Sequence, residues 1–144
     1  MVKRAKQYAK RKVKSCFMWL YRAYRKLCVK KKPCVLFLSE QNAVISTNLR
    51  AVYDRMYARG LEREFVILTA FRSSAGKKKR SLIEGHRLLL KLAKADFIIV
   101  DDHVPFLDWF QLDKKTTLIQ IWHGGLGFKA SGYSRWAIKA ARLQ

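Results

Sequence analysis

A histidine followed by a cluster of glycines is the stretch of this sequence best suited to chemistry. His123 ends an apolar run, residues 118–122, and the residues after it are mostly small or basic. Among them are Gly124, Gly125, Gly127 and Lys129. A neutral imidazole can take a proton from an attacking hydroxyl, while glycine N–H groups and a lysine can face phosphate oxygens. The pattern predicts transfer to an alcohol, with phosphate involved. The alternative is that a strand and a turn produce the same pattern and that the histidine has no function.

A second polar cluster, Asp101, Asp102 and His103, directly follows another apolar run. Carboxylates and an imidazole at the end of a strand can bind manganese or zinc. Such a site needs further ligands, and the sequence has no other segment rich in aspartate or histidine. We therefore interpret the cluster as the polar end of a strand, with Asp101 or Asp102 capping a helix, and predict no metal site.

Three familiar catalytic signatures are absent from the sequence. Residues 39–48, which follow the first predicted strand, contain no glycine, so the G-x-G-x-x-G dinucleotide fingerprint is missing. There is also no P-loop and no G-x-S-x-G segment, and no cysteine stands where a strand meets a turn. The sequence therefore argues against a dinucleotide-dependent enzyme, an NTPase and a covalent nucleophile, and it predicts no cofactor.

The scaffold that must position these groups is predicted to be of the α/β class. Short apolar runs predict strands at residues 34–38, 65–71, 95–100 and 117–122. Amphipathic runs predict helices at residues 49–59, 82–93 and from 133 onward, with a short helical turn within 105–112. This alternation calls for a parallel, helix-covered, Rossmann-like sheet, and we expect its first and last strands to be buried.

The charge of the chain is extreme and unevenly distributed. The formal net charge is +21, and no acidic residue occurs before Glu40. Such a field attracts polyanions such as nucleic acid, anionic lipid or phosphorylated substrates. Half of the residues are hydrophobic, which allows a real core in a single domain. The three cysteines form no C-x-x-C pair, which indicates a reduced, cytosolic compartment.

The basic N-terminus is predicted to be one long amphipathic helix over residues 1–32, which Pro33 ends. Its tryptophan and tyrosine suit a membrane interface, whereas its longest uncharged stretch, residues 15–21, is too short for the ~20 residues that cross a bilayer. We expect peripheral binding to an anionic membrane, with packing on its own domain and nucleic-acid binding as the alternatives. The residues expected at the membrane are Lys14, Phe17, Trp19, Arg22, Tyr24, Arg25 and Lys26.

The segment around His123 is the most specific one in the chain. It reads W-H-G-G-L-G-F-K-A-S-G-Y-S over residues 122–134. This resembles the W-H-x-x-G-x-F-K-x-x-G-Y-S segment of the CDP-glycerol:poly(glycerophosphate) glycerophosphotransferase family, the teichoic acid polymerases and primases of Gram-positive bacteria. Looser matches are the S-x-N-x-R-A-[IV]-Y pattern at residues 46–53 and the approach to the third strand at residues 93–101. The resemblance covers about residues 34–144.

The resemblance implies a GT-B fold, in which two Rossmann-like halves flank the active site. Residues 34–144 would be the acceptor-side half, preceded by a membrane-associating helix at residues 1–33. It implies transfer of glycerol phosphate from CDP-glycerol to a lipid-linked polyol-phosphate acceptor, at the cytoplasmic face of the plasma membrane, without a dinucleotide cofactor or a structural metal. The residue that it implicates is His123, as the catalytic base. The substrate-binding residues that we expect are Gly124, Gly125 and Lys129, from the pattern described above, and Asn48, which lies in the looser match at residues 46–53.

The chain departs from the family pattern in two ways. Many members read W-H-G-T-P, whereas residues 122–126 read W-H-G-G-L, which leaves glycerol versus ribitol phosphate and the acceptor open. The resemblance also covers only the half without the CDP site, so we expect no transfer by this chain alone. The alternatives are a GT-B enzyme with a sugar-nucleotide donor and a non-enzymatic basic domain that binds nucleic acid or membrane. A nucleic-acid-binding domain would leave the Trp-His-Gly segment unexplained and is disfavoured.

Overall fold

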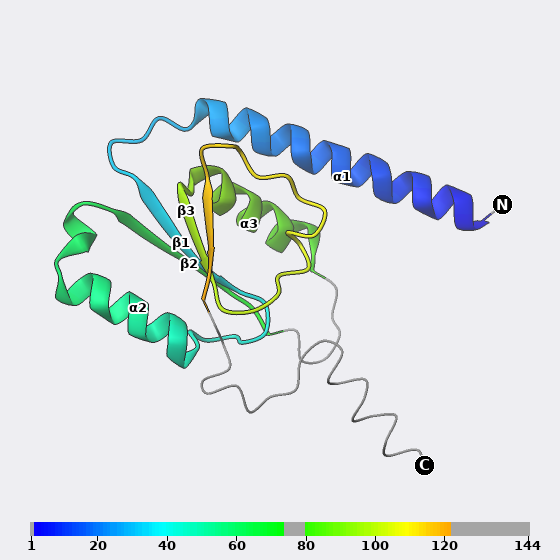
Figure 1. Ribbon diagram of the computed structural model, residues 1–144. Helices are drawn as coiled ribbons and strands as arrows, with labels where there is room; N and C mark the ends of the chain where they lie inside the picture. Colours follow the sequence, from blue (N-terminus) through cyan, green and yellow to red (C-terminus); the bar gives the residue numbers. More distant parts are fainter. Residues whose placement is uncertain (1, 74–79, 122–144) are drawn as a thin grey trace, which may run out of the picture.

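The structure is a computed structural model that describes residues 2–73 and 80–121 (Figure 1). The helix expected from residue 133 lies outside the described residues. In chain order the elements are α1 (Val2–Leu27), β1 (Cys34–Ser39), α2 (Thr47–Ala58), the 3-10 helix η1 (Leu61–Arg63), β2 (Val66–Phe71), α3 (Leu82–Lys94), β3 (Phe97–Val100) and β4 (Thr117–Gln120). Most of the boundaries expected from the sequence are reproduced to within two residues.

The four described strands form one sheet in the order β2-β1-β3-β4, and every neighbouring pair is parallel. The predicted Rossmann-like parallel sheet is therefore confirmed. From β1 the chain moves outward to β2 on one side, and then returns to β3 on the other side (Figure 1). Sheets with such a reversal bind ligands at the carboxyl ends of the two strands that flank it. Here these strands are β1 and β3.

Side chains that alternate along β1 build a core on each face of the sheet. Leu36 and Leu38 are fully buried with Leu89 of α3, whereas Phe37 is fully buried on the opposite face with Leu49 of α2. All six residues of β1 are buried, as the continuous apolar run predicts. Helix α3 therefore covers one face and α2 the other, while α1 packs on α3 (Figure 1).

Polar residues at the helix ends explain where α2 and α3 begin. Ser46 caps α2 by accepting a hydrogen bond from the N–H of Leu49. Ser81 and Glu84 form a reciprocal capping box at the start of α3. Helix α2 is the next helix after the carboxyl end of β1, and α3 is the next helix after the carboxyl end of β2. Their first turns therefore lie at the edge of the sheet where ligands bind in this fold.

Helix α1 ends at Leu27, five residues before the predicted boundary, because the following segment makes tertiary contacts that a helix would prevent. In that segment Lys30 reaches Asp96 at 2.5 Å and the carbonyl oxygen of Lys94 at 3.0 Å. The N–H of Cys34 donates to Asp96 Oδ2 at 2.9 Å. These bonds draw the chain from the helix into β1 and outweigh the helical pattern of residues 28–32.

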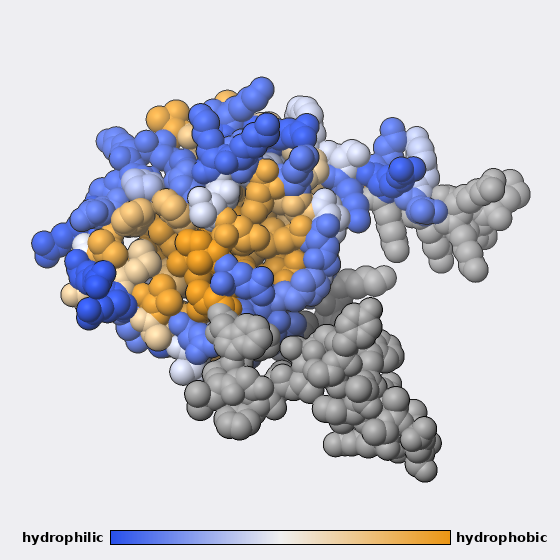
Figure 2. All heavy atoms as spheres, viewed as in Figure 1, coloured by the Kyte–Doolittle hydropathy of each residue, from blue (hydrophilic) through white to orange (hydrophobic). Residues whose placement is uncertain are grey.

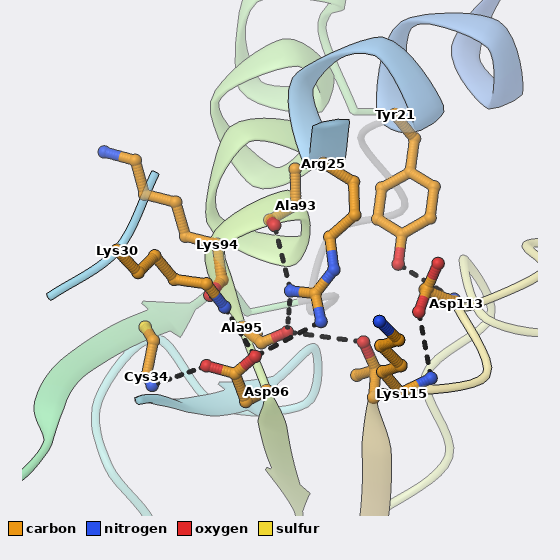
Figure 3. Close-up of polar contacts among 11 residues, drawn as sticks. Tyr21, Arg25, Lys30, Cys34, Ala93, Lys94, Ala95, Asp96, Asp113 and Lys115 are labelled. Atoms are coloured by element: carbon orange, nitrogen blue, oxygen red, sulfur yellow. Dashed lines mark hydrogen bonds and ion pairs between the residues drawn. The ribbon is translucent and has the colours of Figure 1, made fainter. Parts of the chain in front are cut away.

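A set of polar contacts around Asp96 fastens the end of α1 to the domain (Figure 3). Arg25 donates to the carbonyl oxygens of Ala93 and Ala95, at 3.2 and 2.7 Å, and to Asp96 Oδ1 at 3.2 Å. Only 13% of the Arg25 side chain and 23% of the Asp96 side chain are exposed to solvent. One turn earlier, the hydroxyl of Tyr21 accepts a hydrogen bond from the N–H of Asp113 at 3.0 Å. Helix α1 is thus an integral part of the domain.

The surroundings of Asp96 favour its charged form. Burial by itself would raise the pKa of this carboxyl group. The hydrogen bonds from Lys30 and from the Cys34 N–H, together with the positive charges of Lys30 and Arg25, outweigh that effect and lower the pKa of Asp96 below its ordinary value. The carboxylate therefore stabilises the folded state over most of the pH range.

The segment between β3 and β4 was predicted to contain a helical turn within residues 105–112, and this prediction is wrong. The segment instead forms successive turns, with hydrogen bonds from the Leu107 N–H to the Val104 carbonyl and from the Phe110 N–H to the Leu107 carbonyl. Phe110 stacks edge-on against Tyr21, with their ring centroids 4.8 Å apart. The aromatic side chains are drawn onto α1, and this packing decides the path of the backbone.

Strand β4 was expected to be buried, yet all four of its residues are exposed. It pairs with β3 on one side and has no strand on its other side within residues 2–73 and 80–121. Leu118 is 46% exposed and Ile119 is 40% exposed. Figure 2 shows an apolar surface over β4 and the turns before it, bordered by hydrophilic residues. The apolar residues of β4 thus predicted the strand correctly, but the prediction that the strand is buried is wrong for the described residues.

Candidate functional site

A polar pocket of about 430 Å³ lies where the strand order reverses, between the carboxyl ends of β1 and β3 and the start of α2. We call it the switch-point pocket. The residues that line it are Gln41, Asn42, Ser46, Thr47, Asn48, Asp101 and Asp102. Its volume falls within the ~300–1,000 Å³ of typical small-molecule sites. Most of its lining side chains carry amide or hydroxyl groups, which recognise ligands through hydrogen bonds.

Asp101 is the most unusual residue of the switch-point pocket. It is only 2% exposed, and its Oδ1 atom has no hydrogen-bond partner among the described residues. Ser39, at the matching position on β1, is 1% exposed and its Oγ atom is likewise without a described partner. Leaving one such buried polar atom unpaired costs about 1–3 kcal/mol. The unpaired oxygens of Ser39 and Asp101 lie at neighbouring strand ends, so the cost in folding free energy is concentrated at this edge of the sheet.

The other members of the Asp-Asp-His cluster do have partners. Asp102 Oδ1 accepts a hydrogen bond from the N–H of His103 at 2.7 Å, and His103 Nε2 lies 2.7 Å from Asp108 Oδ1. Within residues 2–73 and 80–121, no group of three or more potential metal-binding side chains comes together. The hydrogen bond of Asp102 to the backbone fits the polar strand end that was expected from the sequence. The expected helix cap is wrong, because turns and not a helix follow Asp101 and Asp102.

Asn48, the one predicted substrate-binding residue among the described residues, lines the switch-point pocket from the first turn of α2. The first N–H groups of a helix have no acceptor within the helix, and its dipole makes that end positive. The pocket therefore combines hydrogen-bond donors from α2 with acceptors from β3. Such a mixture suits a ligand whose groups both donate and accept.

A second pocket, of about 390 Å³, opens at the carboxyl end of β2 beside α3. We call it the basic pocket, because its charged lining residues are Arg72, Arg80, Arg87, Lys91 and Glu84. Arg80 pairs with Glu40, and Lys91 donates to the Thr69 carbonyl at 2.6 Å. The exposed Arg87 makes no hydrogen bond or ion pair within the described part of the chain. The excess of positive charge makes this pocket suitable for an anion.

The basic pocket was not predicted from the sequence, although a signal for it is present. The charged residues Arg80, Glu84, Arg87 and Lys91 recur at spacings of three and four, which places them on one side of α3 and its approach. Arg72 follows β2 directly. Only the folded chain shows that these two groups meet, since both line one pocket and Arg72 Nε lies 4.0 Å from Glu84 Oε2.

The seven residues predicted to contact a membrane divide into two groups on α1. Phe17 and Tyr24 pack against the core, with Tyr24 Oη 2.9 Å from His86 Nε2, and Arg25 binds Asp96. Packing of this face on the domain was one of the alternatives considered from the sequence. The residues that remain exposed are Lys14, Trp19, Arg22 and Lys26. Lys14 lies over the ring of Trp109, at 5.0 Å from its centroid.

An exposed stripe on α1 remains available for a partner. Trp19, Arg22 and Lys26 recur at spacings of three and four, which aligns them on one side of a helix, and Trp19 is 68% exposed. In the part of the chain that the structure describes, no helix combines enough length and apolarity to cross a membrane. We call these three residues the exposed stripe.

The remaining predicted site residues, His123, Gly124, Gly125 and Lys129, lie outside the described residues. The last described residue, Ile121, continues the pairing of β4 with β3 through a hydrogen bond from its N–H to the Val100 carbonyl at 2.8 Å. Ile121 is therefore placed beside Asp101, at the edge of the sheet that holds the switch-point pocket. His123 follows Ile121 by two positions in the sequence.

Comparison with known proteins finds a family match and several relatives. The model of the family described as CDP-Glycerol:Poly(glycerophosphate) glycerophosphotransferase matches residues 19–143. The Staphylococcus aureus (strain NCTC 8325 / PS 47) teichoic acid ribitol-phosphate polymerase TarL is 34% identical over 107 residues, which cover 74% of this chain and 19% of the relative.

Two further relatives give the same result. Teichoic acid ribitol-phosphate polymerase TarK of the same S. aureus strain is 29% identical over 119 residues, covering 83% of this chain and 23% of the relative. The teichoic acid poly(ribitol-phosphate) polymerase of Bacillus spizizenii (strain ATCC 23059 / NRRL B-14472 / W23) is 27% identical over 133 residues, covering 92% of this chain and 21% of the relative. The chain thus spans about a fifth of the length of these relatives.

Proposed function

Because the chain belongs to the CDP-glycerol:poly(glycerophosphate) glycerophosphotransferase family, we propose that it is the acceptor-binding part of a teichoic acid polymerase. The observation that carries the proposal is the family match, which extends through the Trp-His-Gly segment at residues 122–134. The switch-point pocket supports it, since ligands of open parallel sheets bind at such a reversal of strand order.

In the proposed reaction His123 acts as the general base. Its imidazole takes the proton from the terminal hydroxyl of the acceptor, and the hydroxyl oxygen attacks the phosphorus atom that carries the polyol of a CDP-linked donor. A new phosphodiester bond forms, the bond between the two phosphates of the donor breaks, and CMP leaves with the electron pair. Gly124, Gly125 and Lys129 would face the donor phosphates, where N–H groups and a positive charge stabilise the transition state.

We propose glycerol phosphate from CDP-glycerol as the transferred group, in line with the family description, with ribitol phosphate as the alternative. The names of the three relatives refer to ribitol phosphate. The CDP group would be bound by a second half of the enzyme. The acceptor would be a lipid-linked polyol-phosphate chain.

A chimera tests this function directly. The matching segment of the S. aureus ribitol-phosphate polymerase is replaced with this chain, and transfer of radiolabelled polyol phosphate from CDP-glycerol and CDP-ribitol to a lipid-linked acceptor is measured. We expect turnover with at least one donor. A chimera that melts cooperatively but transfers neither group would contradict the proposal, because the acceptor-binding part should be interchangeable between members of one family.

The basic pocket would hold phosphate groups of the acceptor. We expect the substitution Arg87→Glu to weaken binding of a short polyol-phosphate oligomer about tenfold at low salt, with a smaller effect at high salt. Arg55→Glu, on the exposed side of α2, changes the net charge by the same amount and is the matched control. Equal losses for the two variants in a fluorescence-anisotropy titration would assign the effect to net charge and remove the basic pocket from the site.

We also propose that the protein is attached peripherally to the cytoplasmic face of the plasma membrane through the exposed stripe. Each lysine or arginine near anionic lipid contributes about 1 kcal/mol, so Arg22→Glu with Lys26→Glu should weaken binding to anionic vesicles at least ~30-fold. The control is Arg55→Glu with Arg59→Glu, which makes the same charge change on α2. An equal fall in co-sedimentation for the two double variants would contradict attachment through the exposed stripe. Equal co-sedimentation of the wild-type chain with neutral and with anionic vesicles would contradict it as well.

A further inference from the structure

The buried oxygen Oδ1 of Asp101 needs a donor that no described residue supplies. Asp101 lines the switch-point pocket and is 98% shielded from solvent, with only 2% of its surface exposed. An unpaired buried carboxylate oxygen is one of the more costly features that a fold can retain. A ligand in the pocket that donates a hydrogen bond would relieve this cost when it binds.

The other groups of the pocket indicate which donor this is. The carboxylate of Asp102 already accepts a hydrogen bond from the backbone, and the remaining lining side chains are neutral amides and hydroxyls. Thr47 and Asn48 present such groups from the first turn of α2. A hydroxyl group donates one hydrogen bond and accepts others, so it matches a site that offers both kinds of partner. Phosphate would be repelled by two neighbouring carboxylates.

The two pockets at this edge of the sheet therefore differ in the chemistry that they favour. The switch-point pocket contains carboxylates and neutral groups, while the charged residues of the basic pocket are four cations and one carboxylate. The ion pair between Glu40 and Arg80 joins the chain that follows β1 to the lining of the basic pocket. A polyol-phosphate chain alternates uncharged polyols with anionic phosphates. It therefore matches a pocket that favours hydroxyl groups beside a pocket that favours anions.

We propose that the switch-point pocket is a polyol subsite, in which Asp101 Oδ1 accepts a hydrogen bond from a hydroxyl group of the acceptor's terminal polyol. The identity of the polyol rests on the proposed function. The need for a hydroxyl donor rests on the unpaired Asp101 Oδ1 and on the neutral lining of the pocket. Asp101 here binds and orients the acceptor. The proton that leaves during transfer is assigned to His123.

The test is a titration of the isotopically labelled 144-residue chain with ribitol and with glycerol, followed by NMR at the amides of Asn48 and Asp102. We expect saturable shifts with at least one polyol. Asp101→Asn, which keeps the shape of the side chain, should weaken that binding at least about tenfold and leave the melting temperature unchanged or raised. Asp102→Asn makes the same charge change in the same pocket, and its effect should stay below about threefold because this carboxylate already has a backbone partner.

Three results would overturn the proposal. The first is no saturable polyol binding by the wild-type chain, and the second is binding by Asp101→Asn within twofold of wild type. The third is a lower melting temperature of Asp101→Asn, which would mean that the carboxylate is already partnered within the chain. Thr47→Val is a second variant, at an exposed position, that should also weaken polyol binding.

Two probes separate the polyol from other ligands, and the chimera separates the two proposals. Inorganic phosphate and magnesium ions should leave the Asn48 and Asp102 amides unshifted, and shifts equal to those with polyols would assign the pocket to an ion. Transfer by the chimera without polyol binding here would reject the subsite and keep the function. Polyol binding here without transfer by the chimera would reject the function and keep the subsite.

Discussion

Replacing His123 with alanine is expected to abolish polyol-phosphate transfer by the chimera while leaving binding of the CDP-linked donor largely intact. General base catalysis contributes about 10²–10⁴-fold to a rate, and the loss should fall in that range. The effect should appear in kcat, because the imidazole acts on the acceptor proton during attack rather than on the bound donor. Initial rates at saturating donor, together with a separate donor-binding measurement, distinguish these quantities.

The choice of control and of pH makes this test specific for a base. His86→Ala removes an exposed histidine that contacts Tyr24 on α1, and its transfer rate should remain near normal. Wild-type transfer should decline at acidic pH, because a protonated imidazole cannot take a proton from the acceptor. Added imidazole should restore part of the rate of His123→Ala. Near-normal turnover of His123→Ala would remove this residue from the role of base.

Replacing Asp96 with alanine is expected to lower the free energy of unfolding by about 3 kcal/mol at neutral pH. The carboxylate holds Arg25 and Lys30 together with the first N–H of β1, and its loss would leave two partly buried cations without their anion. Chemical denaturation of the whole chain measures the loss. We expect α1 to separate from α3 more readily in this variant, so that its amide protons exchange faster.

An exposed ion pair provides the comparison for this stability prediction. Asp54 pairs with Arg50 along α2 at 3.8 Å, and more than half of each side chain is exposed. Asp54→Ala should therefore cost at most about 0.5 kcal/mol. If the losses for Asp96→Ala and Asp54→Ala are similar, the contacts around Asp96 do not hold α1 in place.

The contribution of Asp96 should also depend on pH in a defined direction. Because the pKa of this carboxyl group is lowered by folding, the stabilisation is fully present above the pKa of the unfolded chain, which is near the reference value of 3.8. It disappears as the pH falls through the lower pKa of the folded state. The stability difference between wild type and Asp96→Ala should thus be constant from neutral pH to about pH 5 and shrink below the reference value.

The order and the type of the elements follow from local pattern. Continuous apolar runs predicted β1, β2 and β3, and helical periodicity with serine caps predicted α2 and α3, because burial on a regular element repeats at short range. Strands that alternate with helices through short connections pack as a parallel sheet covered by those helices. His123 could be singled out because a histidine followed by glycines after an apolar run is visible in the sequence itself.

What only the tertiary structure decided concerns residues that are distant in sequence. The wheel of α1 shows an apolar face, but not that Phe17 and Tyr24 would pack on the domain while Trp19 would stay exposed. The exposure of β4 likewise depends on whether a neighbour covers it, which no local pattern contains.

The same distinction applies to the candidate site. The sequence alone predicted the parallel sheet and the basic amphipathic helix, and it singled out His123 as the candidate base. The register of β1 with β3 places Ser39 next to Asp101, and the packing of α3 on β2 brings Arg72 to the cations of α3. Burial and unpaired hydrogen-bonding atoms are properties of such long-range neighbours. For this reason the two pockets became visible only when the chain was folded.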